Sequence, residues 1–346
     1  MREAVIVSIA RTPVGKAKKG IFADTRIEDL GKVVLQEVVE RARLDMNDVD
    51  DIIIGCAMPE GEQGLNMARN IALYAGFPVS TPALTINRFC SSGLQSIAFA
   101  ADRIKSGGAE VIIAGGMESM SHVPMTGFHF SPHPTIVDEM PQLYMGMGYT
   151  AEEVADRFAV SRADQDHFAF RSHQKAARAI VEERFNEEIV PVTVVRNEEK
   201  LIVRKDEGVR AETTVEALSQ LKPVFKKGGT VTAGNTSQMS DGAAACVVME
   251  KEKAFAFGLE PLATIRSFAL AGVEPEIMGV GPVKAIPKAL EMANVNIEDV
   301  DLFEINEAFA SQCVHVIREL KLDEEKVNVN GGAIALGTHS VVQVQS

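Results

Sequence analysis

Four cysteines are the residues of this sequence best suited to covalent chemistry, and one of them stands apart by its position. Cys90 lies in the segment NRFCSSGLQS, directly after a strand-like run and at the start of a helix-like run. A thiol at a helix N-terminus faces unpaired N–H groups and the positive end of the helix dipole, both of which favour the thiolate. Cys90 is therefore a candidate nucleophile, and a buried core thiol is the alternative interpretation of the same residue.

The other cysteines and the histidines do not form a predicted metal or disulfide site. Cys56, Cys246 and Cys313 lie inside apolar runs, so we expect them to pack in the core. The four cysteines are far apart and include no C-x-x-C pair, which argues against a zinc ribbon and a disulfide framework. The 7 histidines show no H-E-x-x-H or other metal-ligand spacing. The sequence therefore predicts no metal site.

Two further segments have the composition of a binding or catalytic site. Asn306 lies in EINEAFA, between a strand-like and a helix-like run, where its amide can orient a water or donate to an oxyanion. A helix N-cap is the alternative role for this asparagine. Residues 229–245, GTVTAGNTSQMSDGAAA, are mostly small and polar, which lets a ligand lie along the backbone. An ordinary polar loop is the alternative there.

A dinucleotide or nucleotide site is disfavoured. GGAIALG at 331–337 has no lysine after its last glycine, so it is not a Walker A loop. The first strand-like run is followed by ARTPVGK, where a dinucleotide-binding fold would place its glycine fingerprint. These features weigh against a nucleotide-dependent α/β oxidoreductase.

The elements that must position these residues alternate between strand and helix. Strand-like runs at 3–10, 51–58, 82–87 and 110–116 are separated by helix-like runs at 27–43, 66–76 and 91–107. This alternation predicts an α/β fold with a mostly parallel, doubly wound sheet. The pattern returns after Gly234, which suggests a duplicated α/β unit around an insertion. Within the insertion, Thr150 with Glu153 matches a capping box that would open a long helix reaching about residue 187.

Composition limits the class of protein and its partners. Of the 346 residues, 46% are hydrophobic and 24% are charged, the balance of a soluble globular protein. The net charge of −13 argues against a general binder of nucleic acid or of anionic membranes. We find no apolar run of about 18 residues and no secretory signal, so we predict no membrane span and a cytoplasmic location.

Seven motifs in order make the chain resemble the thiolases, the acyl-CoA:acetyl-CoA C-acyltransferases, from residue 1 to about 337. They are ARTPVGK, NRFCSSGLQS, AGGMESMS, MGYTAEEVA, GTVTAGNTSQMSDGAAA, NEAFA and NVNGGAIALG. The CSSGLQ form is more similar to the degradative 3-ketoacyl-CoA thiolases than to the acetoacetyl-CoA-forming enzymes, which remain the alternative. A ketoacyl synthase, which belongs to the related condensing enzymes, would need two downstream catalytic histidines. Only His315 and His339 lie in the last third of this sequence.

The resemblance implies two α/β halves with layered sheets and helices, plus an inserted loop domain. The first half would be residues 1–120 and 242–260, and the second would be the incomplete stretch 261–346. The loop domain, residues 121–241, would cover CoA. The resemblance further implies a homodimer or homotetramer that uses CoA as a substrate and has no tightly bound cofactor, in fatty-acid β-oxidation.

The resemblance also implies roles for individual residues. Cys90 would take the acyl group from a 3-ketoacyl-CoA, expel the acetyl-CoA enolate and pass the acyl group to CoA. Asn306 would position a water that stabilises the enolate, and Ser237 would bind the pantetheine arm of CoA. Further contacts to the substrate would come from Ala233, Ala308, Phe309 and Met147.

The sequence departs from the family after Gly337. Thiolases continue with G-H-P-L-G-C-T-G-A, in which the histidine activates the nucleophile and the cysteine acts as acid and base. Deleting one base from codons for G-H-P-L-G-C-T-G-A-K gives G-T-H-S-V-V-Q-V-Q-S, which is residues 337–346 in full. We therefore predict that residues 338–346 are a frameshifted tail and that the last part of the second half is missing. Such a chain is expected to expose strand edges, to fold poorly and to lack turnover, as an inactive remnant of a thiolase.

Overall fold

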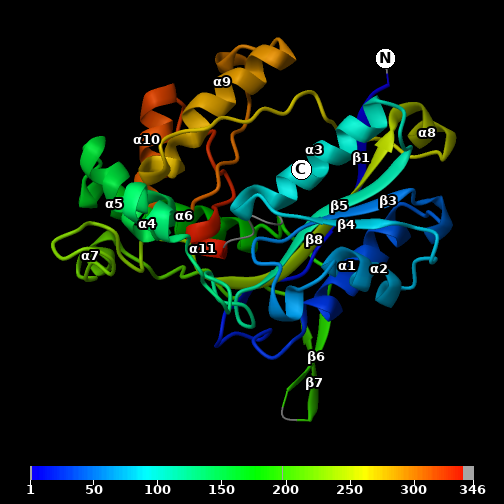
Figure 1. Cartoon of the computed structure of the whole chain (residues 1–346), viewed down its shortest axis with the longest axis horizontal. Helices are drawn as coiled ribbons and strands as arrows, with labels where there is room; N and C mark the ends of the chain where they lie inside the picture. The colour runs from blue at the N-terminus through cyan, green and yellow to red at the C-terminus, as the bar shows by residue number, and fades with distance from the viewer. Residues whose placement is uncertain (1, 197, 338–346) are drawn as a thin grey trace.

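One mixed sheet organises the computed structural model, which describes residues 2–196 and 198–337 (Figure 1). Its strands lie in the order β4 (Ala83–Ile86), β3 (Asp51–Gly55), β5 (Val111–Ser119), β8 (Ser240–Glu250), β1 (Ala4–Arg11) and β9 (Ala263–Thr264). A short strand, β2 (Gly15–Lys16), pairs with the start of β8. The α/β class is confirmed. The predicted frameshifted tail, residues 338–346, lies outside the described residues.

The expectation of a mostly parallel sheet is wrong, because four of the six strand pairings in the described sheet are antiparallel and two are parallel. β3, β4 and β5 are parallel, as their helical crossovers require. β8 runs antiparallel to both β5 and β1. The chain enters β8 from the long insertion that follows β5, and not from a single crossover helix, so its direction is not constrained to be parallel.

Helices cover both faces of the sheet. α1 (Ile27–Arg41) and α2 (Met67–Ala75) pack on one face, and α3 (Ser92–Lys105) packs on the other (Figure 1). Side chains alternate along β3, so that Ile52 and Ile54 enter the first core while Ile53 enters the second. Ile53 therefore faces α3, while Ile52 and Ile54 face α1 and α2.

The insertion between β5 and β8 carries helices and a projecting hairpin (Figure 1). These elements are α4 (Pro134–Glu139), α5 (Met147–Arg157), α6 (Arg162–Val181), β6 (Val192–Arg196), β7 (Glu199–Val203) and α7 (Val215–Ser219). The predicted capping box at Thr150 is wrong, because α5 begins earlier and the Thr150 hydroxyl donates to the carbonyl of Met147. The capping box instead lies at Ser161 and Asp164, which open α6.

The rest of the described chain adds helices but few strands. They are α8 (Lys251–Ala256), α9 (Gly281–Ala293), α10 (Ala310–Leu320) and α11 (Ala333–Leu336). Short 3-10 helices lie at Met46–Asp48, Gly61–Gln63, Phe89–Ser91, Pro141–Tyr144, Pro275–Val280 and Ile297–Asp299.

The expected second sheet does not form among the described residues. The strand-like run 262–272 contributes only β9, and Phe303 meets Val327 in a single parallel bridge. Because these segments lack further partner strands, Phe303, Ile305 and Val327 pack instead against the buried side of α10. Among the described residues, the chain after residue 261 therefore contributes helices, one short strand and a single bridge between its own segments.

Candidate active site

Cys90 lies in the 3-10 turn Phe89–Ser91, immediately before α3 begins at Ser92. Its side chain is exposed, whereas Cys56, Cys246 and Cys313 are buried as predicted. Phe89 beside it has a φ of +44°, in the left-handed region that bulky residues rarely adopt. Such a conformation is held in place only where the surroundings determine it, and it is common at functional sites.

Close packing brings the start of α3 onto the end of β3. A Cβ at Gly55 would lie 2.6 Å from the backbone nitrogen of Gly93 and would also meet Ser92, so a larger residue cannot occupy this position. The Ser92 hydroxyl donates to the Phe89 carbonyl at 2.6 Å and accepts from the Arg88 backbone N–H at 2.8 Å. The turn that carries Cys90 is therefore fixed to the carboxyl end of a central strand.

Burial separates the other three thiols chemically from Cys90. It raises the pKa of Cys56, beside the carboxylate of Glu118, and it raises the pKa of Cys246 and Cys313 as well. A thiol with a raised pKa is mostly protonated near neutral pH and is a poor nucleophile. Among the cysteines, the exposed Cys90 is the one positioned to react with a solute.

Asn306 offers an unpaired acceptor. Its side-chain oxygen Oδ1 is buried and has no hydrogen-bond partner in the described chain. The alternative role as an N-cap is wrong, because α10 begins at Ala310 and its N-cap is Phe309. Buried acceptors are nearly always paired in folded proteins, so an unpaired one is suited to a water or a ligand.

The residues on either side of Asn306 are held firmly. Asn328 accepts from the Ile305 N–H at 2.8 Å and donates to the Ile305 carbonyl at 2.9 Å. The buried carboxylate of Glu307 accepts from Ser172 Oγ at 2.6 Å, Asn328 Nδ2 at 2.8 Å and the Ile334 N–H at 3.1 Å. Burial raises the pKa of Glu307. We call Glu307, Asn328 and Ser172 the Asn306 clamp.

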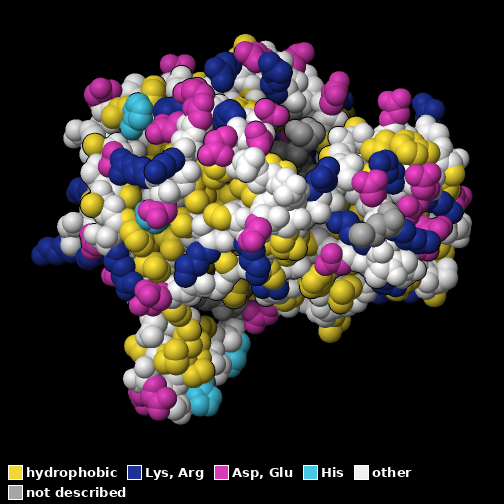
Figure 2. Space-filling model, turned by 90° about the horizontal axis from the view of Figure 1, so that it is seen from above, with side chains coloured by type: hydrophobic (Ala, Val, Ile, Leu, Met, Phe, Trp, Pro, Cys, Tyr) yellow, Lys and Arg dark blue, Asp and Glu magenta, His cyan; other side chains and the backbone are white. Residues whose placement is uncertain are grey.

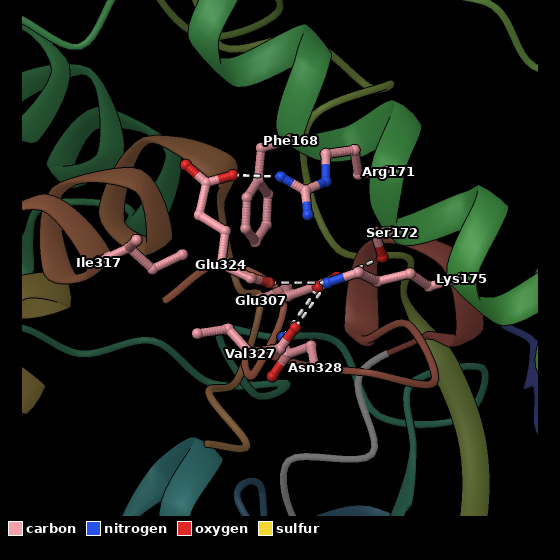
Figure 3. Close-up of a pocket in the computed structure, with 9 residues that line it drawn as sticks. All are labelled: Phe168, Arg171, Ser172, Lys175, Glu307, Ile317, Glu324, Val327 and Asn328. Atoms are coloured by element: carbon pink, nitrogen blue, oxygen red, sulfur yellow. Dashed lines mark hydrogen bonds and ion pairs between the residues drawn. The ribbon is translucent and has the colours of Figure 1, made fainter. Parts of the chain in front are cut away.

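The clamp lines a small cavity between α6 and the segment that carries Glu307 (Figure 3). Figure 3 shows Ser172 and Asn328 directed toward Glu307. Lys175, which lies on α6 like Ser172, is beside them. The Lys175 ammonium donates to the carbonyls of Glu324 at 3.0 Å and Val327 at 2.8 Å. The residues that line this cavity therefore hold the backbone on either side of Asn306.

The predicted CoA-binding residues come together around one short pairing. Ser237 N–H donates to the Ala308 carbonyl at 3.0 Å, and Thr236 forms an antiparallel bridge with Phe309. The Asn235 carbonyl accepts from the Ala310 N–H at 2.9 Å. The polar segment 229–245 and the EINEAFA segment, far apart in sequence, therefore lie side by side.

Aromatic contacts connect this pairing to α5. The ring of Phe309 meets Phe225 edge-on with centroids 6.2 Å apart, and Phe225 meets Tyr149 at 6.3 Å. Phe225 also packs where a Cβ of Gly148 would lie. Met147, the first residue of α5, is half-buried next to these residues, and Ala233 is exposed in the polar segment.

Strand register places Cys90 and the polar segment at the same edge of the sheet. Gly55 of β3 is paired with Gly116 of β5, which is paired with Ala244 of β8. The polar segment enters β8 at Ser240, a few residues before Ala244. Because β8 is two strands from β3, about 10 Å separates them laterally. Cys90 and the start of β8 therefore lie at the same end of the sheet.

Several supporting residues were missed by the sequence analysis. Arg11 of the ARTPVGK motif makes two hydrogen bonds to Asp206, at 2.8 and 3.0 Å, and one to Glu188 at 2.5 Å. Gly208 follows closely and accepts from Gln238 Nε2 at 2.9 Å, which also donates to α11. The ARTPVGK motif is thus connected, through residues 206–208, to Gln238 next to Ser237. The one sequence signal for this role is the charged Arg11 directly after an apolar run.

Carboxylates of the insertion hold the other end of the polar segment. Glu152 accepts from the N–H groups of Thr230 and Val231 at 2.8 and 3.0 Å. Asp166 accepts from the Asn235 side chain at 3.0 Å. The segment is therefore an ordered loop held in place by charged groups.

In the face seen in Figure 2, acidic and basic side chains are intermixed. Within residues 2–196 and 198–337, no helix is long and apolar enough to cross a membrane, and no cluster of potential metal ligands occurs.

An exposed cysteine at a helix N-terminus, at one end of an α/β sheet, is an arrangement that enzymes use to form a covalent intermediate. The N-terminal domain model of thiolases matches residues 4–252, and the C-terminal domain model matches residues 259–341. The chain belongs to the thiolase family.

Relatives and solved structures agree with the family. A 3-ketoacyl-CoA thiolase of Bacillus subtilis is 58% identical over 97% of this chain and 88% of its own length. A probable acetyl-CoA acyltransferase of Staphylococcus epidermidis is 46% identical with the same coverage. The acetyl-CoA acetyltransferase of Bacillus anthracis superposes with a TM-score of 0.91 at 42% identity, over 99% of this chain and 89% of that one. Human mitochondrial 3-ketoacyl-CoA thiolase gives 0.89 at 38% identity, with the same coverage.

Proposed function

We propose that the activity of this protein, expected of the chain with its reading frame restored after Gly337, is CoA-dependent cleavage of 3-ketoacyl-CoA through an acyl-enzyme on Cys90, and the reverse condensation. The observation that carries the proposal is the exposure of Cys90 at the start of α3, with the other three cysteines buried. The Bacillus subtilis relative, named a 3-ketoacyl-CoA thiolase, supports the substrate class. The proposed setting is fatty-acid β-oxidation in the cytoplasm.

The reaction divides into two balanced steps. The Cys90 thiolate adds to the C3 carbonyl of the substrate, and the bond between C2 and C3 breaks. Its electron pair leaves with acetyl-CoA as an enolate, which takes up a proton to give acetyl-CoA. The thiolate of free CoA then attacks the acyl-enzyme, the new thioester is released, and the Cys90 thiolate is restored.

Asn306 fits the role of positioning a water for the enolate. Its unpaired Oδ1 accepts one O–H of a water, whose second O–H donates to the developing enolate oxygen. The Asn306 clamp holds the backbone on both sides, so this acceptor is fixed in direction before substrate binds. A fixed donor needs no reorganisation as charge develops in the transition state.

CoA enters this proposal as a substrate, with no tightly bound cofactor. Ser237 contacts its pantetheine arm, in the pairing that holds the polar segment against the EINEAFA segment. The remaining contacts come from Ala233, Ala308, Phe309 and Met147. Residues 121–241 form the domain that covers CoA, between the half made of 1–120 and 242–260 and the half 261–346. The matched ranges of the two family models support a division near residue 260.

The alternative activity is formation of acetoacetyl-CoA from two acetyl-CoA. The likeness to the Bacillus anthracis acetyl-CoA acetyltransferase favours it. Thiolysis of acetoacetyl-CoA and of 3-ketooctanoyl-CoA distinguishes the two. The proposal expects a higher kcat/KM for the longer chain, and a strong preference for acetoacetyl-CoA would favour the alternative.

We also propose a homo-oligomer, a dimer or a tetramer. Among the described residues, β4 is the last strand of the sheet and pairs on one side only, with β3. Leu84 on this strand is 46% exposed, and Phe89 just after it is 59% exposed. An open strand edge with exposed apolar side chains is a pairing surface. Sedimentation of the protein and of Leu84→Lys tests this, with a shift toward monomer expected for the variant.

For residues 338–346, we propose that the natural reading continues as G-H-P-L-G-C-T-G after one restored base. A fresh DNA read across these codons tests the proposal directly. Thiolysis is then measured for the 346-residue chain, for the frame-restored product and for its Cys90→Ser variant. The restored product is expected to turn over and the other two are not. Turnover by the 346-residue chain would overturn the frame proposal, and turnover by the Cys90→Ser variant would overturn the nucleophile.

A further inference from the structure

A continuous series of hydrogen bonds runs from the turn that carries Cys90 into the core. The Phe89 N–H, next to Cys90, donates to Asn87 Oδ1 at 2.7 Å. Asn87 Nδ2 donates to the carbonyl of Ala57 at 3.0 Å, and the N–H of Ala57 donates to Glu118 Oε2 at 2.6 Å. Asn87 and Glu118 thus stand at the two ends of a short bridge through one backbone residue.

The inner end of this bridge is held rigidly. Glu118 is buried near the end of β5, and its other carboxylate oxygen accepts from Gln63 Nε2 at 2.5 Å. Gln63, itself fully buried, accepts from the Ser119 N–H at 2.5 Å and donates to the Met58 carbonyl at 2.8 Å. Gln63, which donates to the Glu118 carboxylate, is therefore itself fixed by bonds to β5 and to the loop after β3, and the Cys56 thiol also faces this carboxylate at 4.0 Å.

The outer end of the bridge holds a strained backbone. Phe89 has a φ of +44°, a left-handed conformation that is unfavourable for a bulky residue. The hydrogen bond from Asn87 to the Phe89 N–H stabilises this conformation directly. Without it, Phe89 can relax toward negative φ, which would turn the neighbouring Cys90 away from the start of α3.

We propose that Asn87 and Glu118 are positioning residues for the Cys90 nucleophile, acting together through the backbone of Ala57. The inference rests on the proposed function, because it needs Cys90 to be the reacting thiol. It assigns to the buried carboxylate of the AGGMESMS motif a task at the reactive turn. A purely structural role for both residues would change stability and leave the reactivity of Cys90 alone.

The test is the rate at which iodoacetamide alkylates Cys90, followed from pH 5 to 10 by mass spectrometry. It needs no turnover and uses the full chain. Asn87→Ala is expected to lower the rate at pH 7 about tenfold and to raise the pH midpoint of alkylation by about one unit. Glu118→Gln, which keeps the shape but turns one acceptor into a donor, is expected to lower the rate several-fold. The double variant should be no slower than Asn87→Ala, since both changes break one bridge.

Asn66→Ala is the matched control. Asn66 also bonds backbone through both ends of its amide, at the start of α2, and it lies outside the bridge. Its variant should lose comparable stability and keep the alkylation profile of the wild type. Asn87→Ser, which keeps an acceptor, should recover part of the rate.

The outcomes separate this inference from the proposed function. If wild-type Cys90 reacts no faster than the three buried cysteines, the nucleophile assignment and the positioning inference both fail. If wild-type Cys90 reacts fast and Asn87→Ala and Glu118→Gln keep that rate and midpoint, only the positioning inference fails. Additive losses in the double variant would overturn the connection through Ala57.

Discussion

Replacing Asn328 with alanine should destabilise the protein far more than the loss of one exposed amide would. Asn328 is buried and makes three hydrogen bonds, two with the backbone of Ile305 and one with Glu307. Asn328→Ala leaves the Ile305 N–H and carbonyl unpaired and removes one of three donors to Glu307. Each buried group left unpaired costs roughly 1–3 kcal/mol. We expect the free energy of unfolding to fall by about 4 kcal/mol, a large part of the 5–15 kcal/mol typical of a folded protein.

Urea unfolding followed by circular dichroism measures this change. Asn330→Ala is the control, because Asn330 is two residues away and half-buried, and we expect it to cost less than about 1 kcal/mol. Asn328→Asp keeps the acceptor for the Ile305 N–H but places a second carboxylate beside Glu307, so its loss should shrink as the pH falls. A loss below about 1 kcal/mol for Asn328→Ala would refute the clamp on either side of Asn306.

Three further predictions concern the site and its supports. Asn306→Ala should keep the free energy of unfolding within about 1 kcal/mol of the wild type while lowering kcat of the frame-restored product about 100-fold; an unchanged kcat would argue against the enolate role. Burial, followed by the nearby Arg210 and Lys16, lowers the pKa of His173 to about 4. The unfolded chain therefore gains a proton between pH 6.5 and 4 that the folded chain does not, and up to about 3 kcal/mol of stability is lost as the pH falls through this window. His173→Gln should flatten that dependence in unfolding measurements, and an unaltered slope would contradict the assignment. Gly148→Val meets the Phe225 ring, so it should cost about 1–3 kcal/mol and raise the KM for CoA; a normal KM would separate α5 from the binding site.

Local patterns in the sequence were sufficient to predict the secondary structure around Cys90. The switch from strand-like to helix-like spacing at NRFCSSGLQS predicted a helix over 91–107, and α3 spans Ser92–Lys105. The same reasoning separated the exposed cysteine from the three in apolar runs. Both inferences depend on residues close in sequence, where periodicity is informative.

The direction of a strand, and the choice between two similar capping-box patterns, could not be predicted from the sequence in the same way. The apolar run of β8 has the same pattern whether the strand is parallel or antiparallel, so its pairing with β5 and β1 had to come from the structure. Two sites, Thr150 with Glu153 and Ser161 with Asp164, both match a capping box, and only the second begins a helix. The N-cap interpretation of Asn306 failed because the extended chain continues to Phe309.

The polar supports of the site depend on contacts between distant residues. Glu307 meets Ser172 across 135 positions, and Arg11 meets Asp206 across 195. A buried charge in an apolar context indicates that a partner exists, but spacing does not identify it. The division of the chain into two halves and a loop domain, and the reading frame after Gly337, stay predictions.

Competitive labelling of the four cysteines tests the central claim most directly. The full chain is treated with limiting iodoacetamide at pH 7, with and without acetyl-CoA, and digested with trypsin. The peptide of residues 89–103 then reports Cys90. We predict that Cys90 is labelled first and that acetyl-CoA protects it, while Cys56, Cys246 and Cys313 stay largely unmodified. Equal labelling of all four, or labelling of Cys90 that acetyl-CoA does not slow, would contradict an acyl-transfer site at Cys90.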